Sequence, residues 1–161
     1  MRRLQRTIEE IGWSREVPRL ADTARVASAF DLMRRVKHDC VLVTRGDELA
    51  GIFTSHDFLN RVAAVRGDLD QMTLAEVMTR RPYTLRPSDD VVFAINWMGV
   101  EDFRNVPIVD DRGRVLGVLT IWDVMRHLGE FFDEIDATPR QVAPTVDSSS
   151  STSMIDLGGD Q

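Results

Sequence analysis

Two segments of seven residues follow the same pattern in this chain, at residues 51–57 (Gly-Ile-Phe-Thr-Ser-His-Asp) and at residues 117–123 (Gly-Val-Leu-Thr-Ile-Trp-Asp). The two copies start 66 residues apart and share glycine, threonine and aspartate at the same positions. Each copy ends an apolar run typical of a strand and begins a run typical of a helix. The repeat therefore predicts one structural unit used twice, with a polar site at the strand-to-helix junction of each copy.

The residues around the two copies predict the same order of elements, which is strand, helix, strand, strand, helix. In the first half the expected elements are an extended piece at 17–20, a helix from a cap at Asp22 or Thr23 to about Lys37, strands at 40–44 and 49–53, and a helix at 55–65. In the second half they are a short capped helix at 73–78, a strand at 83–85, a helix from a cap at Ser88 or Asp89 to about Gly99, strands at 106–110 and 115–119, and a helix from Ile121 to about Ile135. This order indicates a mixed α/β (α+β) fold made of two βαββα halves.

The expected domain boundaries follow the repeat. Residues 1–14 form an N-terminal extension with a short helix at 4–11 that Gly12 ends, 15–68 the first domain, 69–136 the second, and 137–161 a disordered tail that is low in aromatic residues. Each domain has only about 60 residues, which is too few to bury a large core alone. We therefore expect the apolar helix faces of the two halves to pack on each other around a pseudo-twofold axis, with the repeated junctions in clefts between the halves.

Charge and composition exclude several classes of protein. The net charge of -6 argues against nucleic acid as a partner. No apolar run approaches the roughly 20 residues that cross a bilayer, and no apolar core follows the basic N-terminal residues as in a secretory signal. The single cysteine, Cys40, excludes an internal disulfide and a metal site built from several cysteines. A cytoplasmic protein without membrane contact or metal is expected.

The chain resembles a tandem pair of cystathionine-beta-synthase (CBS) domains, also called a Bateman module. The resemblance is carried by residues 76–90 (Glu-Val-Met-Thr-Arg-Arg-Pro-Tyr-Thr-Leu-Arg-Pro-Ser-Asp-Asp), 106–110, 117–123, 41–43 and 51–57, and it covers roughly residues 15–135. It implies a stand-alone member that binds an adenine nucleotide or a related adenosyl compound in up to two clefts and regulates another protein. It also implies a flat homodimer formed through the helices.

The repeated motif itself suits a sugar and phosphate. Because Thr54 and Asp57 lie on one side of a first helical turn, the carboxylate can accept hydrogen bonds from both ribose hydroxyls, and the threonine can donate to a phosphate or sugar oxygen. Free backbone N–H groups at the helix start favour an anion there. Thr120 and Asp123 repeat the arrangement, and the resemblance assigns the ribose to these aspartates. The alternative is a capping box that only secures the helix end.

Three basic residues are candidates for phosphate binding. His38 and Arg104 precede the middle strands of the two halves by two residues, where the resemblance implies phosphate contacts. Arg104 carries a permanent charge, whereas His38 contributes fully only when protonated, so its site would weaken as pH rises. His56 lies inside the first motif. The alternative for each is a solvated side chain on the surface.

The resemblance also implies an adenine pocket, lined by Thr84, Val106, Pro107 and, in the other cleft, Cys40. For Cys40 the alternative is a small buried apolar residue, and we prefer it.

No phosphate-binding loop, dinucleotide fingerprint or His-Glu-x-x-His motif occurs in the sequence. Cys40 with one nearby histidine gives weak support for a nucleophile. We therefore predict a regulatory module rather than an enzyme, without a catalytic cofactor, that binds AMP, ADP or ATP and responds by altered domain or dimer packing. The alternatives are a structural dimerisation module without ligand, or a module for S-adenosylmethionine or a cyclic dinucleotide. The regulated protein stays unknown.

Overall fold

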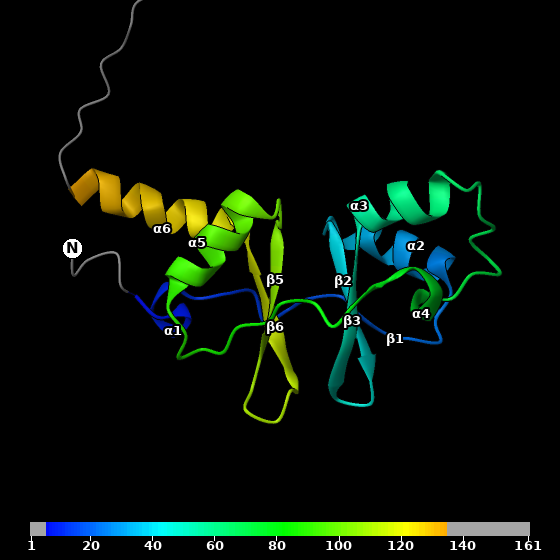
Figure 1. Ribbon diagram of the computed structural model, residues 1–161, viewed down its shortest axis with the longest axis horizontal. Helices are drawn as coiled ribbons and strands as arrows, with labels where there is room; N and C mark the ends of the chain where they lie inside the picture. Colours follow the sequence, from blue (N-terminus) through cyan, green and yellow to red (C-terminus); the bar gives the residue numbers. More distant parts are fainter. Residues whose placement is uncertain (1–5, 135–161) are drawn as a thin grey trace, which may run out of the picture.

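The computed structural model describes residues 6–134. The start of the expected N-terminal helix and the whole tail predicted at 137–161 lie outside the described residues. The first half contains β1 (Arg19–Ala21), α2 (Val26–Val36), β2 (Cys40–Arg45), β3 (Glu48–Thr54), α3 (Ser55–Asp57), the π-helix η1 (Phe58–Ala63), α4 (Leu74–Val77) and β4 (Thr79–Arg80). The second half contains α5 (Val91–Val100), β5 (Asn105–Val109), β6 (Val115–Thr120) and α6 (Ile121–Glu134), and α1 (Ile8–Ile11) packs on it. The mixed fold of two halves is confirmed (Figure 1).

Each repeated motif ends a β-hairpin at the same point. In the first half β1 runs parallel to β2, and β2 pairs with β3 antiparallel so that Cys40 lies opposite Thr54. In the second half β5 pairs with β6 antiparallel, and Asn105 lies opposite Thr120. A helix starts directly after each threonine. Because the hairpin register fixes both threonines at the same end of their sheets, the two junctions are positioned alike.

Two predicted helix starts are wrong. The helix α2 begins after Arg25 rather than after Asp22 or Thr23, because the Asp22 carboxylate accepts hydrogen bonds from Arg45 and Arg25 pairs with Thr73 as an isolated bridge. The helix α5 begins after Asp90, whose carboxylate accepts from the backbone N–H of Val92.

Two further elements differ from the sequence prediction. The strand predicted at 83–85 is reduced to a single parallel bridge between Leu85 and Ile108, since Leu85 alone exchanges backbone hydrogen bonds with β5. The helix predicted at 55–65 becomes a short α-helix followed by a π-helix, in which the N–H of Ala64 donates to the carbonyl of Leu59.

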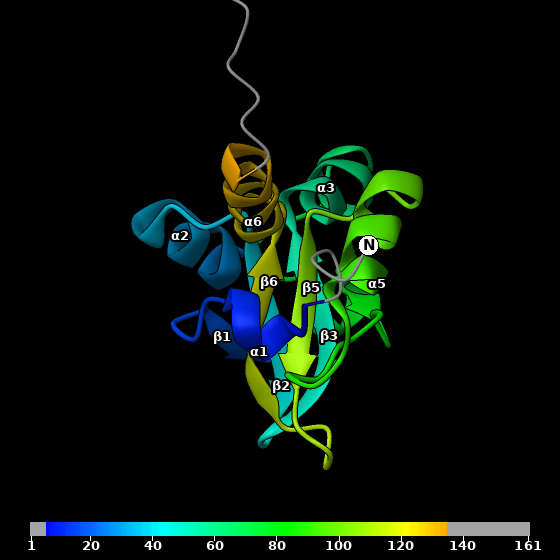
Figure 2. The same ribbon diagram turned by 90° about the vertical axis from the view of Figure 1, so that its left-hand side faces the viewer.

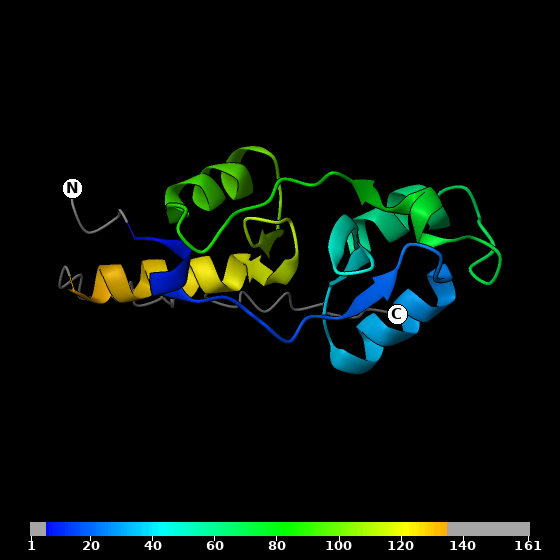
Figure 3. The same ribbon diagram turned by 90° about the horizontal axis from the view of Figure 1, so that it is seen from below.

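The N-terminal segment completes the second half of the molecule. Ile8 of α1 is fully buried in the second-half core, and Ser14 exchanges backbone hydrogen bonds with Val118 of β6. In the first half, α4 and β4 take the same places beside the core and β3. The 66-residue repeat therefore extends to the capping boxes that begin α1 and α4, which are formed by Thr7 with Glu10 and by Thr73 with Glu76. Figure 3 shows α1 beside α6.

Strand residues rather than helix faces join the two halves, contrary to the expectation from sequence. One buried cluster spans both halves and combines residues of β2, β3 and β6 with Val17: Val17, Cys40, Leu42, Ile52, Val115 and Val118. Figure 2 shows α2, α3, α5 and α6 gathered at one end of these strands. The helices can therefore keep apolar side chains exposed, among them Phe93 of α5 and Trp122 of α6. No helix within residues 6–134 is long and apolar enough to cross a membrane.

Candidate functional site

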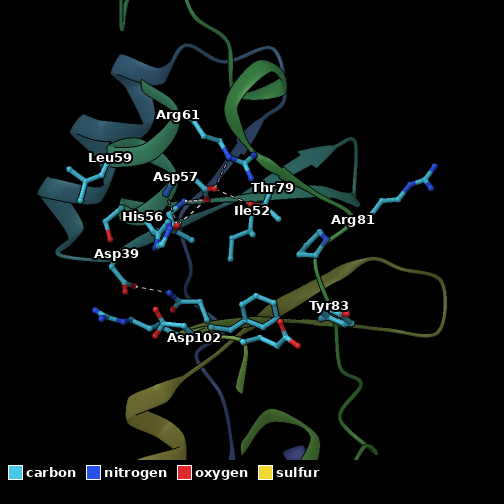
Figure 4. Close-up of a pocket in the computed structure, with 17 residues that line it drawn as sticks. Asp39, Ile52, His56, Asp57, Leu59, Arg61, Thr79, Arg81, Tyr83 and Asp102 are labelled. Carbon is cyan, nitrogen blue, oxygen red and sulfur yellow. Dashed lines mark hydrogen bonds and ion pairs between the residues drawn. The ribbon is translucent and has the colours of Figure 1, made fainter. Parts of the chain in front are cut away.

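A cavity of about 510 Å³ opens between the two halves, next to the first copy of the repeated motif (Figure 4). Its volume lies within the range of about 300–1,000 Å³ that is usual for small-molecule sites. The first half lines it with Asp39, Ile52, Thr54, Ser55, His56, Asp57, Leu59, Arg61 and Thr79. The segment leading to the second half and the loop before β5 complete it with Arg81, Pro82, Tyr83, Glu101, Asp102, Phe103, Arg104 and Asn105.

The local part of the first junction is a complete capping box. The Asp57 carboxylate oxygen Oδ2 accepts hydrogen bonds from the backbone N–H of Thr54 at 3.0 Å and from its hydroxyl at 2.9 Å. The Thr54 hydroxyl in turn accepts from the N–H of Asp57 at 3.2 Å. The capping that the sequence left open is therefore present in the structure, and the Thr54 hydroxyl already uses its proton within the chain.

The other carboxylate oxygen of Asp57 is held by residues from farther along the chain. Oδ1 accepts a hydrogen bond from the Thr79 hydroxyl of β4 at 2.9 Å and lies 3.4 Å from Nε of Arg61. Arg61 also donates to the carbonyls of Val77 and Met78 at the end of α4, at 3.3 and 2.7 Å. With its side chain 7% exposed, Asp57 is a buried carboxylate whose charge is balanced by these donors.

Of the candidate phosphate ligands, His56 and Arg104 line the cavity from opposite halves, whereas His38 does not. Lys37 takes a left-handed backbone conformation with φ 55°, and the following His38 places Nδ1 3.5 Å from the Cys40 sulfur and 3.8 Å from the Asp39 carboxylate. Asp39 itself lines the cavity and accepts a hydrogen bond from the Asn105 side chain at 3.2 Å. This bond joins the two halves at the rim of the cavity.

The candidate adenine residues do not line this cavity. Cys40, Val106 and Pro107 are buried, and Thr84 is half-buried. Burial, and then the charge of Asp39, raises the pKa of the Cys40 thiol. The ligand atoms of His38, Asp39 and Cys40 lie within 4.8 Å of one another, but a metal ligand has to be a thiolate, which this burial disfavours. The interpretation of Cys40 as a small buried core residue fits its place between the halves.

Several residues of the cavity are not predicted from the sequence. Arg61 could have been found because it lies one helical turn after Asp57. Arg81 and Tyr83 follow β4 within the interdomain segment and bring a cation and an aromatic ring to the cavity. Thr79 gave no signal, since it reaches Asp57 only through the pairing of β4 with β3.

The second junction repeats the capping box but not its surroundings. The Asp123 carboxylate accepts hydrogen bonds from the Thr120 N–H at 2.9 Å and from its hydroxyl at 2.7 Å. Its other oxygen pairs with the exposed Arg126 at 2.6 Å. Trp122 is 76% exposed and does not share the buried side of Asp123.

The structural counterpart of Thr79 is Ser14, because Ser14 pairs with Val118 as Thr79 pairs with Ile52. The counterpart of Arg61, counted forward by 66 residues, is His127. Packing supports the first match, because Gly51 faces the side chain of Met78 and the carbonyl of Thr79, and Gly117 faces the side chain of Trp13 and the carbonyl of Ser14. His127 is 5% exposed, and within residues 6–130 neither of its ring nitrogens nor the indole N–H of Trp13 has a hydrogen-bond partner. The two junctions therefore share a cap and differ in the side-chain bonds that reach the aspartate from outside it.

Comparison with known proteins identifies the repeated unit. A family model described as "CBS domain" matches residues 14–64 and 74–130. Among the curated relatives, the meiotically up-regulated gene 70 protein of Schizosaccharomyces pombe is 33% identical over 129 residues, which are 80% of this chain and 17% of that protein. A homoserine O-acetyltransferase of Methanocorpusculum labreanum is 33% identical over 116 residues, 71% of this chain and 22% of the enzyme. The chain thus spans less than a quarter of either relative.

Solved structures share the fold. The CBSX2 structure, in complex with AMP, superposes with a TM-score of 0.67 at 22% identity and covers 78% of this chain and 98% of that one. The CBS domain pair of protein MJ0100, in complex with 5'-methylthioadenosine and S-adenosyl-L-methionine, superposes with a TM-score of 0.69 at 23% identity and covers 79% and 98%.

Proposed function

Because this chain belongs to the CBS domain family and carries the domain twice, we propose that it is a regulatory module that binds an adenine nucleotide between its two halves. The observation that carries the proposal is the cavity of about 510 Å³ that contains Asp57, His56 and Arg104 together. Two proteins of the same fold were solved with AMP or with adenosyl compounds, which supports an adenosine-containing ligand.

Each part of such a ligand has a matching group in the cavity. The ribose hydroxyls are assigned to Asp57 and Thr54, and a phosphate to His56 and Arg104, with Arg81 as a further cation. Tyr83 and Phe103, whose ring centroids are 5.6 Å apart, offer aromatic surface to the base. Since residues of both halves would contact one molecule, a ligand that fits one arrangement of the halves better shifts the equilibrium toward it.

The ligand is proposed to be AMP, ADP or ATP, with S-adenosylmethionine or a cyclic dinucleotide as the alternative. Thr120 and Asp123 are proposed as a second ribose site, with Thr84, Val106 and Pro107 as its adenine pocket, whereas His38 and Cys40 do not line the first cavity. The module is proposed to act in the cytoplasm as a regulator of an unknown protein, not as a catalyst. Some curated relatives are named as enzymes, and this chain matches only a minor part of their length.

A homodimer formed through the helices is the second part of the proposal. Exposed apolar side chains gather on α5 and α6, which contact each other: Val92, Phe93, Val100, Trp122 and Met125. Large exposed apolar patches mark interaction surfaces. Light scattering at micromolar concentration should give twice the mass of one chain, and Trp122→Glu should halve it. A monomeric wild type would contradict the dimer, and it would not distinguish between the proposed ligands.

Binding is tested by calorimetry with AMP, ADP, ATP, S-adenosylmethionine and cyclic dinucleotides, on the wild type and on Asp57→Ala and Asp123→Ala. A ligand present at 100 times its Kd should stabilise the fold by about 2.7 kcal/mol. Loss of binding in one variant identifies the working cleft. The absence of any binding would contradict the sensor and support the dimerisation module.

A further inference from the structure

We propose that Thr79 and Arg61 form a latch on Asp57 that competes with the ligand's ribose, so that binding at this cleft releases β4 and thereby the connection to the second half. The inference rests on the proposed function, because it assumes that a ribose diol approaches Asp57. Thr79 and Arg61 would then set the affinity of the cleft, and β4 would transmit ligand binding to the second half.

The competition follows from the number of acceptor positions on the carboxylate. An ionised carboxylate has about four lone-pair positions on its two oxygens. In the structure Oδ2 accepts both hydrogen bonds of the Thr54 cap, and Oδ1 is taken by the Thr79 hydroxyl at 2.9 Å and approached by Arg61 Nε at 3.4 Å. Because two ribose hydroxyls need two of these positions, and the cap holds Oδ2, the ligand has to displace Thr79, Arg61 or both from Oδ1.

Both latch residues lie in the cavity itself. Thr79 and Arg61 are among its lining residues, and Figure 4 shows their side chains directed at Asp57. The Thr79 hydroxyl takes the place of one ribose hydroxyl, so that without ligand the Asp57 oxygen Oδ1 receives its hydrogen bond from the protein itself. The Thr79 hydrogen bond is thus a cost that every ligand of this cleft has to overcome.

The segment that the latch holds is short and leads to the second half. The strand β4 has two residues, and its pairing with β3 covers only Gly51 and Ile52. Arg61 fixes the preceding carbonyls of Val77 and Met78. Directly after β4, Arg81 takes a left-handed backbone with φ 48°, an uncommon and costly conformation for a residue other than glycine.

The consequence is a coupling between cleft and linker. Once the ligand takes Oδ1, the Thr79 hydroxyl loses its partner, and β4 keeps only its few hydrogen bonds to β3. Arg81 and Tyr83, which follow it and line the same cavity, are then free to rearrange on the ligand. The latch thereby converts occupancy of one carboxylate into a change in the segment between the halves.

The test compares Thr79→Val with Thr79→Ser by calorimetric titration with AMP, ATP and S-adenosylmethionine. Valine keeps the branched shape and removes the hydroxyl, whereas serine keeps the hydroxyl. Since the ligand then no longer has to displace a hydrogen bond to a charged carboxylate, we expect Thr79→Val to bind at least tenfold more tightly, which is about 1.4 kcal/mol. Thr79→Ser should bind like the wild type. Unchanged or weaker binding by Thr79→Val, in a protein whose wild-type binding is abolished by Asp57→Ala, overturns the latch and leaves the proposed function standing.

Hydrogen exchange supplies a second measurement that does not depend on the affinity. Ligand should accelerate exchange at the amides of Thr79, Arg80, Arg81 and Tyr83 in the wild type, and Thr79→Val should show this faster exchange before ligand is added. Protection of these amides by ligand overturns the release of β4. If neither the wild type nor Thr79→Val binds any of the three compounds, the proposed function fails and the latch with it.

Discussion

The surroundings of Asp57 and Asp123 show how one motif can serve two different sites. Both aspartates accept the same two hydrogen bonds from a threonine three residues earlier. Asp57 is also held by Thr79 and Arg61, whereas their counterparts in the second half, Ser14 and His127, give Asp123 no hydrogen bond among residues 6–130. The local cap is therefore common to both copies, and the availability of the carboxylate is decided by the segments that pack beside it.

The helices that follow the two motifs also differ in their type. After Asp57 the chain winds into the π-helix η1, whereas after Thr120 a regular α-helix runs to Glu134. Short π-helical turns are rare and are frequently found at functional sites. Arg61 lies within η1 and reaches both Asp57 and the end of α4. We infer that the first junction is adapted to hold the linker, and the second to hold the N-terminal segment.

The largest effect is expected where that N-terminal segment touches β6. A Cβ atom on Gly117 would lie 2.1 Å from the carbonyl oxygen of Ser14, while on Gly51 it would lie 2.6 Å from the flexible sulfur of Met78 and 2.7 Å from the Thr79 carbonyl oxygen. Gly117→Ala should therefore lower the free energy of unfolding by about 3 kcal/mol and Gly51→Ala by somewhat less, both measured by urea denaturation. Gly99→Ala, with open space around it in α5, is the control and should not destabilise. Equal losses at both glycines would show that the two attachments are equally tight.

The second prediction compares the variants in which Asp57 or Asp123 is replaced by alanine. Asp57→Ala leaves the Thr79 hydroxyl and the Arg61 guanidinium without their partner as well as the cap, so we expect a loss of about 3 kcal/mol in the free energy of unfolding. Asp123→Ala removes the cap and a bond to an exposed arginine, for which about 1 kcal/mol is expected. Denaturation of both variants without ligand decides the matter. A loss of only about 1 kcal/mol in each would mean that Thr79 and Arg61 add nothing to the cap.

The sequence predicts the local part of each site and not the part contributed from a distance. A capping box of Thr54 and Asp57, which the sequence left open as the alternative to a ribose site, needs only partners within one helical turn, and the structure contains it. Thr79 lies 22 residues beyond Asp57 and meets it only through the pairing of β4 with β3. Ser14, which takes the place of Thr79 in the second half, could have been recognised only by extending the repeat to the helix starts at Thr7 and Thr73, whose capping boxes match.

The third comparison concerns Arg61 and His127. Arg61 makes contacts with a carboxylate and two carbonyls, whereas the buried nitrogens of His127 have no partner among residues 6–130. Replacing an unsatisfied buried polar group by an apolar one of similar size removes a desolvation cost. His127→Leu should raise the free energy of unfolding by about 1 kcal/mol, and Arg61→Leu should lower it by about as much. A destabilised His127→Leu variant would indicate that the imidazole has a partner, and loss of ligand binding in it would identify that partner as the ligand.

The smallest expected effect is on the pH dependence of the melting temperature, and it concerns the capping glutamates of α1 and α4. The pKa of Glu10 is lowered, first by the hydrogen bond from the backbone of Thr7, and that of Glu76 first by the hydrogen bond from the Thr73 side chain. A carboxyl group whose pKa is lower in the folded state binds fewer protons there, so its contribution to stability is complete above the unfolded pKa. That contribution is lost as pH falls below the ordinary value of 4.5 and through the folded pKa. Glu10→Gln and Glu76→Gln should each flatten the decline of melting temperature in this range. Glu10 lies in α1, which packs on the second half. If only Glu76→Gln flattened the decline, α1 would already be detached from the second half at the pH where the protein unfolds.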